Sequence, residues 1–187
     1  AVTLFLLDQQ IPLDDLPAIR QSLDRINIHF ERVNGENATF LNDKNVESRI
    51  RTQRVADKVS LVAKISLVRR FLVEKQKAMG RHKALVMDGR DIGTVVFPEA
   101  KLKIFLEADF SIRTGRRHEE LKDKGFSSLS KDEVQQNLQQ RDHIDSTRQD
   151  SPLRKAPDAK TLDNSQLSRR EQLEIALSWV REITGEA

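Results

Sequence analysis

The chain has 187 residues, of which 37% are hydrophobic and 33% charged, and its formal net charge is +3. This length suits a single domain with a sizeable core, and the charge excess is too small to indicate nucleic-acid binding by itself. No apolar run approaches the roughly 20 residues of a membrane helix. The absence of Cys excludes disulfides and thiolate zinc sites. Because the first ten residues also lack the basic flank and cleavage site of a signal peptide, we expect a cytoplasmic protein without a membrane segment.

The first fifty residues change from a helical to a strand-like pattern. Residues 1–10 read as the end of a helix, and apolar residues at helical spacing predict another over 13–25. Alternating apolar residues then begin at Ile26, and the turn signal Asn34-Gly35 precedes a possible return strand. The sequence therefore predicts a small antiparallel β insert, between helical segments, over 26–43.

In the rest of the chain, strand-like and helical patterns alternate. The expected elements are a helical stretch over 52–78 with a break near Ile65-Ser66, a strand over 84–87 ending at Asp88, a strand over 101–107, a helix over 109–125, a helix over 130–145 with a Ser130/Glu133 capping box, a last strand over 160–164 and an amphipathic helix over 167–184. This alternation predicts an α/β fold with a parallel sheet flanked by helices.

One chemically suggestive stretch is LVMDGRDIGTVVFPEA, over residues 85–100. Ligands of open α/β sheets bind at the carboxyl ends of strands, where this pattern would deliver Asp88. An Asp after an apolar strand resembles the second carboxylate motif of phosphate-loop NTPases, which helps hold Mg²⁺, although Asp-Gly turns are common. Arg90 can donate in a fork to phosphate, and Asp91 can accept from an exocyclic amine.

A second group of charges lies in QQRDHIDSTRQDSPL. If the helix continues, Arg141, Asp145 and Arg148 share one face at i, i+4 and i+7. The spacing fits either a surface ladder of ion pairs or a site for a phosphate and a neighbouring sugar hydroxyl.

A third group is the face formed by Arg113, Arg116 and Arg117 in SIRTGRRHEEL. It fits a solvated helix or a mobile lid over a transferring phosphoryl group, with GFSSLSK supplying flexible residues. Upstream, Ser60 and Arg69 lie on helices, and Arg69 could reach into a cleft.

Taken together, these segments resemble bacterial cytidylate kinase, from about Ile11 to the end of the chain. The most specific matches are DGRDIGTVVFP and RDHIDSTRQDSPLRKAPDA. The resemblance implies a monomeric protein with a nucleoside monophosphate kinase fold, which transfers the γ-phosphoryl group of ATP to CMP or dCMP with Mg²⁺. It also implies a single domain over 1–187, with a monophosphate-binding insert over 12–50 and a lid over 111–150.

The resemblance also implies a role for each candidate residue. Those roles are cytosine recognition by Ser60, Arg69 and Asp91, ribose binding by Asp145, catalytic binding of the acceptor phosphate and neutralisation of the moving charge by Arg90, Arg141 and Arg148, a lid over ATP carrying Arg113, Arg116 and Arg117, and a place near the metal for Asp88. Many positive charges fit this chemistry, because phosphoryl transfer relies on positioning and electrostatics.

The sequence departs from the family at its start, because G-x-x-x-x-G-K-[ST] occurs nowhere in it. We therefore expect the first strand and phosphate loop to be absent from residues 1–187, and these residues alone to lack full activity. Alternative interpretations are a UMP or AMP kinase, a non-catalytic fragment and a nucleic-acid-binding module. Arginines interleaved with acids, rather than gathered in a basic stripe, disfavour the last.

Overall fold

The computed structural model describes residues 1–82, 85–123, 125 and 129–185, and the chain divides into two compact units. The first unit consists of Ala1–Ala84 and Arg148–Asp150, and the second of Leu85–Thr147 and Ser151–Ala187. Within the described residues, no helix is both long and apolar enough to cross a membrane.

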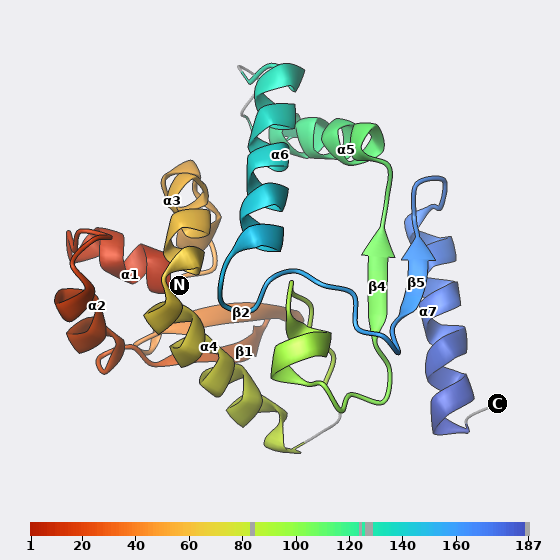
Figure 1. Cartoon of the computed structure of the whole chain (residues 1–187), viewed down its shortest axis with the longest axis horizontal. Helices are drawn as coiled ribbons and strands as arrows, with labels where there is room; N and C mark the ends of the chain where they lie inside the picture. The colour runs from red at the N-terminus through yellow and green to blue at the C-terminus, as the bar shows by residue number, and fades with distance from the viewer. Residues whose placement is uncertain (83–84, 124, 126–128, 186–187) are drawn as a thin grey trace. The chain divides into compact units, whose positions relative to one another are not determined.

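The first unit is made of helices and a small sheet (Figure 1). Its elements are α1 (Val2–Asp8), α2 (Leu16–Leu23), β1 (Ile28–Val33), β2 (Glu36–Leu41), β3 (Lys44–Asn45), the 3₁₀ turn η1 (Arg49–Arg51), α3 (Gln53–Lys64), α4 (Ser66–Met79) and the 3₁₀ turn η2 (Gly80–His82).

The antiparallel insert is confirmed. β1 pairs with β2 in a register that sets Ile28 opposite Leu41. The connecting residues Asn34 and Gly35 have φ values of 53° and 86°, as a two-residue hairpin of type I′ requires. The sheet also contains β3, a short third strand that the sequence did not predict.

The helical break is also confirmed. Ile65 lies between α3 and α4 with extended backbone angles, φ −69° and ψ 110°. Around these helices lies a continuous apolar core, to which α1, α2, the hairpin, α3 and α4 all contribute. Its most deeply buried side chains include Leu6, Ile19 and Val68, each 0% exposed. Apolar packing therefore connects every main element of the first unit.

The second unit contains the parallel strands (Figure 1). Its elements are the π-helical turn η3 (Ile92–Val96), β4 (Ile104–Glu107), α5 (Phe110–Asp123), α6 (Lys131–Thr147), β5 (Lys160–Asp163) and α7 (Arg169–Thr184). β4 and β5 pair in parallel, with Ile104 opposite Lys160 and Glu107 opposite Asp163.

Capping boxes in the sequence specify where two helices of this unit begin. Ser130 and Glu133 form the expected capping box at the start of α6, with Oγ accepting from the Glu133 amide and the carboxylate accepting from the Ser130 amide. Ser168 and Glu171 form a second box at α7. α7 lies beside β5, where the Lys160 ammonium stands 5.2 Å from the centre of the half-buried Trp179 ring.

The expected strand ending at Asp88 is wrong over the described residues 85–87, and Ala84 lies outside them. Leu85 to Met87 have no regular structure, and Val86 is fully exposed. A strand needs a neighbour to pair with its amides and carbonyls, and no described strand of this unit pairs here. An apolar run cannot by itself supply that neighbour.

α6 also ends one residue before the face of Arg141, Asp145 and Arg148 would be complete. Its last residue is Thr147, so Arg148 lies just outside the helix. The Ser146 hydroxyl donates to the backbone carbonyl of Asp142 at 2.8 Å, and the Thr147 hydroxyl donates to that of His143 at 2.6 Å. Such bonds compete with the helical pattern and are common where helices end or bend.

Candidate functional site

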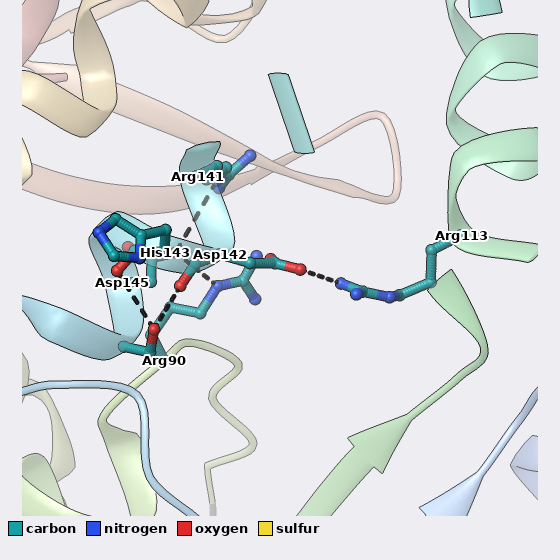
Figure 2. A network of polar contacts seen from close by, with 7 residues as sticks. Arg90, Arg113, Arg141, Asp142, His143 and Asp145 are labelled. Atoms are coloured by element: carbon teal, nitrogen blue, oxygen red, sulfur yellow. Dashed lines mark hydrogen bonds and ion pairs between the residues drawn. The ribbon is translucent and has the colours of Figure 1, made fainter. Parts of the chain in front are cut away.

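A buried carboxylate with two arginines is the centre of the site in the second unit (Figure 2). Asp145, in the last turn of α6, is 5% exposed. Its Oδ2 accepts a hydrogen bond from Nε of Arg90 at 3.1 Å and lies 4.0 Å from Nε of Arg141. A buried carboxylate needs such partners, because its desolvation is costly. The two guanidinium groups exceed it by one positive charge.

Partial burial and this excess charge both lower the pKa of Arg141. Burial lowers the pKa of its guanidinium from the ordinary value, the like charge of Arg90 lowers it further, and Asp145 partly opposes both. The guanidinium remains charged, because arginine side chains are not deprotonated in proteins. An anion bound between Arg90 and Arg141 would relieve the repulsion between them, so this pair is suited to a phosphate.

The loop that carries Arg90 continues into an unusual turn. Asp91 is 4% exposed and directly precedes η3, where its carbonyl accepts from the amide of Val95 at 2.9 Å. π-helical turns are rare and frequent at functional sites. The sequence analysis missed this turn, because the apolar, β-branched run IGTVV gives no signal for it.

The side chain of Lys103 connects this loop to the motif RDHIDSTRQDSPLRKAPDA. The Lys103 side chain is 8% exposed, packs against Gly93 and donates from Nζ to Oδ2 of Asp158 at 2.6 Å. A Cβ added at Gly93 would lie 3.3 Å from the Lys103 side chain. Glycine therefore allows the close approach that connects the 85–100 stretch with the 151–160 segment. Neither Lys103 nor Asp158 was a predicted residue.

The three lid candidates of α5 have three different partners. Arg113 donates to Asp142 of α6 at 2.7 Å, and its guanidinium lies 5.3 Å from the centre of the Phe110 ring. Arg116 donates to Asn164 after β5, to the side chain at 2.9 Å and to the carbonyl at 2.8 Å.

Arg117 pairs with Glu120 of its own helix at 2.8 Å. Arg117 is therefore neutralised within its own helix, whereas Arg113 and Arg116 bind other elements. Residues 126–128 of GFSSLSK, the stretch predicted to supply flexible residues, lie outside the described residues.

Asp88 is exposed and lies on the loop before Arg90. In the described part of the chain, no three His, Asp or Glu side chains gather into a metal site. A single exposed carboxylate still fits Mg²⁺, which usually binds proteins through one or two carboxylates together with waters and substrate phosphates.

The remaining predicted residues belong to the first unit. Ser60 on α3 and Arg69 on α4 are half-buried, and Arg148 is 8% exposed. The structure thus brings Arg90, Arg141 and Asp145 together within the second unit. Asp142, which the sequence analysis also did not single out, connects Arg113 to the same helix.

Parallel strands with flanking helices and a small antiparallel sheet define an α/β protein of the nucleoside monophosphate kinase type. A family model described as cytidylate kinase matches residues 1–182. The chain belongs to the cytidylate kinase family. The match includes the first ten residues, which the sequence resemblance did not cover.

Three curated relatives, each named cytidylate kinase, illustrate the similarity. The relative from Parabacteroides distasonis is 52% identical over 157 residues, covering 82% of this chain and 68% of its own length. That from Flavobacterium psychrophilum is 55% identical over 144 residues, covering 77% and 63%. That from Porphyromonas gingivalis is 44% identical over 191 residues, covering 99% and 82%. The chain thus spans between 63% and 82% of the length of these relatives.

Proposed function

We propose that the full-length protein transfers the γ-phosphoryl group of ATP to CMP or dCMP, giving ADP and CDP or dCDP. The family match over residues 1–182, which includes both specific motifs, is the observation that carries this proposal. The two arginines around Asp145 support it, because they provide the excess positive charge that a phosphate needs.

In the proposed reaction, Arg90, Arg141 and Arg148 hold the acceptor phosphate and balance charge as the phosphoryl group moves. Their contribution is electrostatic and positional, since phosphoryl transfer needs little other chemistry from the protein. Asp145 has two roles in this proposal. It orients Arg90 in the structure, and it would bind a ribose hydroxyl in the complex.

Specificity for cytosine is assigned to Ser60, Arg69 and Asp91. A base lacking complementary groups would leave these side chains with unmet hydrogen bonds, which disfavours it strongly. The base would contact Asp91, a buried carboxylate next to Arg90 in the chain.

ATP is the proposed phosphate donor, and Arg113, Arg116 and Arg117 are its proposed lid contacts. Bound Mg²⁺ would neutralise phosphate charge. Asp88 would hold the Mg²⁺ through water.

Residues 12–50 remain the proposed monophosphate-binding insert, and residues 111–150 remain the proposed lid of one kinase domain. We also expect a cytoplasmic monomer that does not bind nucleic acid.

The test is a comparison of acceptors with the full-length protein, ATP and Mg²⁺. We expect kcat/KM for CMP and dCMP to exceed that for UMP and AMP by about 100-fold or more. Equal turnover of UMP or AMP would contradict the cytosine assignment. If no acceptor is phosphorylated and oligonucleotides bind at low salt, the binding-module interpretation would replace the kinase.

The substitution Asp91→Ala tests the base contact directly. We expect it to raise the KM for CMP about tenfold or more, because a hydrogen bond to a buried charged group is lost, and to change the KM for ATP little. Glu99→Ala, at an exposed position of the same segment, is the matched control. Unchanged CMP kinetics in the Asp91 variant would refute this role.

A further inference from the structure

The contact between Arg113 and Asp142 joins the start of α5 to the last turns of α6. Oδ2 of Asp142 accepts from Nη1 of Arg113 at 2.7 Å, and both side chains are only partly exposed, at 33% and 39%. A charge-assisted bond this short is stronger and more directional than a neutral hydrogen bond. The contact therefore holds the Arg113 guanidinium in one orientation.

Two further observations describe how Arg113 is held. Its guanidinium lies over the Phe110 ring, 5.3 Å from the ring centre. Its Nε is buried, with no hydrogen-bond partner among the described residues. A buried donor left unpaired is unfavourable. The orientation is therefore set by Asp142 and Phe110, while the Nε donor remains unused.

Asp142 also belongs electrostatically to the arginine cluster. It directly follows Arg141 and raises the pKa of that guanidinium, against the lowering by burial and by Arg90. In Figure 2 the Asp142 side chain faces Arg113, while Asp145 lies with Arg90 and Arg141. Two neighbouring carboxylates of one helix thus hold three arginines, of which Arg113 depends on Asp142.

We infer that Asp142 is a positioning residue for the ATP side of the site, because its carboxylate orients Arg113 toward the phosphates of the donor nucleotide. The inference rests on the proposed function, in which Arg113 is a lid contact to ATP. Asp142 itself does not touch the nucleotide. It fixes a long, flexible side chain before binding, so that less conformational freedom is lost when the phosphates arrive.

Because Asp142 is charged, its role in orienting Arg113 can be distinguished from a general electrostatic effect on ATP binding. Removing a carboxylate makes the cluster more positive, and Coulomb attraction alone would then tighten the binding of ATP. Loss of orientation has the opposite effect, because Arg113 becomes mobile. Asp142→Asn therefore distinguishes the two by the direction of the change.

The experiment measures ATP and CMP binding by titration calorimetry, with the full-length protein and Asp142→Asn, Asp142→Glu, Arg113→Gln and the Asn/Gln double variant. We expect Asp142→Asn to weaken ATP binding about fivefold, with CMP binding within about twofold of the wild type. Asp142→Glu should recover part of the loss. In the Arg113→Gln background, Asp142→Asn should have no further effect.

The matched control is Glu174→Gln, which breaks an exposed Arg170–Glu174 pair of similar length, 2.8 Å, on α7. It should change neither affinity. Tighter ATP binding by Asp142→Asn, equal losses for ATP and CMP, or additive effects in the double variant would overturn the inference. Failure of the wild type to bind ATP would overturn the proposed function as well, so the two failures are distinguishable.

Discussion

The two units of this molecule are stabilised in different ways. In the first, apolar side chains from α1, α2, the hairpin, α3 and α4 form one continuous core. In the second, buried apolar side chains are spread over separate elements, such as Leu121 on α5 and Leu162 on β5, and Leu106 of β4 is 60% exposed. Ion pairs instead connect the functional elements of the second unit, including Arg90 with Asp145 and Lys103 with Asp158.

This difference separates two consequences of mutation. Apolar packing is insensitive to charge but sensitive to lost volume. A network of ion pairs is sensitive to charge, because removal of one partner leaves the other partly buried and uncompensated. We therefore expect substitutions in the apolar core of the first unit to change stability mainly, and substitutions in the ion pairs of the second unit to change activity mainly.

The largest expected effect is that of Asp145→Asn in the full-length protein. The substitution preserves the shape of the side chain and removes the charge that holds Arg90 and Arg141. We expect kcat/KM for CMP to fall about 1,000-fold, equivalent to about 4 kcal/mol. Steady-state kinetics measure it, with Asp132→Asn, at an exposed position of the same helix, as the control. A loss below about tenfold would contradict a central role for Asp145.

The next effect contrasts a buried apolar side chain of the first unit with an exposed one of the second. Ile19→Ala removes a side chain that is 0% exposed. We expect it to lower the free energy of unfolding by about 3 kcal/mol. Leu106→Ala, at a position 60% exposed, should change it by no more than about 0.5 kcal/mol. Urea denaturation measures both, and equal effects would remove the distinction between the units.

The smallest effect concerns a charge of the first unit. Hydrogen bonds from Arg51 and Thr39 lower the pKa of Glu47 below its ordinary value of 4.5. Since the folded-state pKa is the lower one, ionised Glu47 stabilises the fold above pH 4.5, and this contribution is lost as the pH falls through the folded-state value.

Glu47→Gln should therefore lower the thermal midpoint slightly at pH 7, by the equivalent of less than about 1 kcal/mol, and the difference from the wild type should shrink as the pH falls below 4.5. Glu174→Gln, on α7, is the control. A difference that grows at low pH would show that the sign is wrong.

The features that the sequence predicted correctly depend on neighbouring residues. Asn34-Gly35 specifies a hairpin turn, and Ser130 with Glu133 specifies a helix start, because each signal acts within four residues. The strand over 85–87 was wrong, since a strand also needs a distant pairing partner that a local pattern cannot reveal.

For the site, the sequence predicted one arginine–carboxylate contact but not the others. The spacing of Arg141 and Asp145 predicted their proximity on one helix, whereas the contact of Arg90 with Asp145 joins residues 55 positions apart. Arg113 and Arg116 share a helix, yet the fold directs one to Asp142 and the other to Asn164. Tertiary packing decides such choices, and a single sequence does not record it.

The contact of Trp179 with Lys160 has a spectroscopic consequence. Within these 187 residues there is one Trp and no Tyr. The indole of α7 lies 5.2 Å from the ammonium of a residue in β5. Its emission therefore reports whether the last helix stays docked on the parallel strands. A red shift on gentle warming, before the far-ultraviolet dichroism changes, would reveal undocking of α7 as a step separate from unfolding.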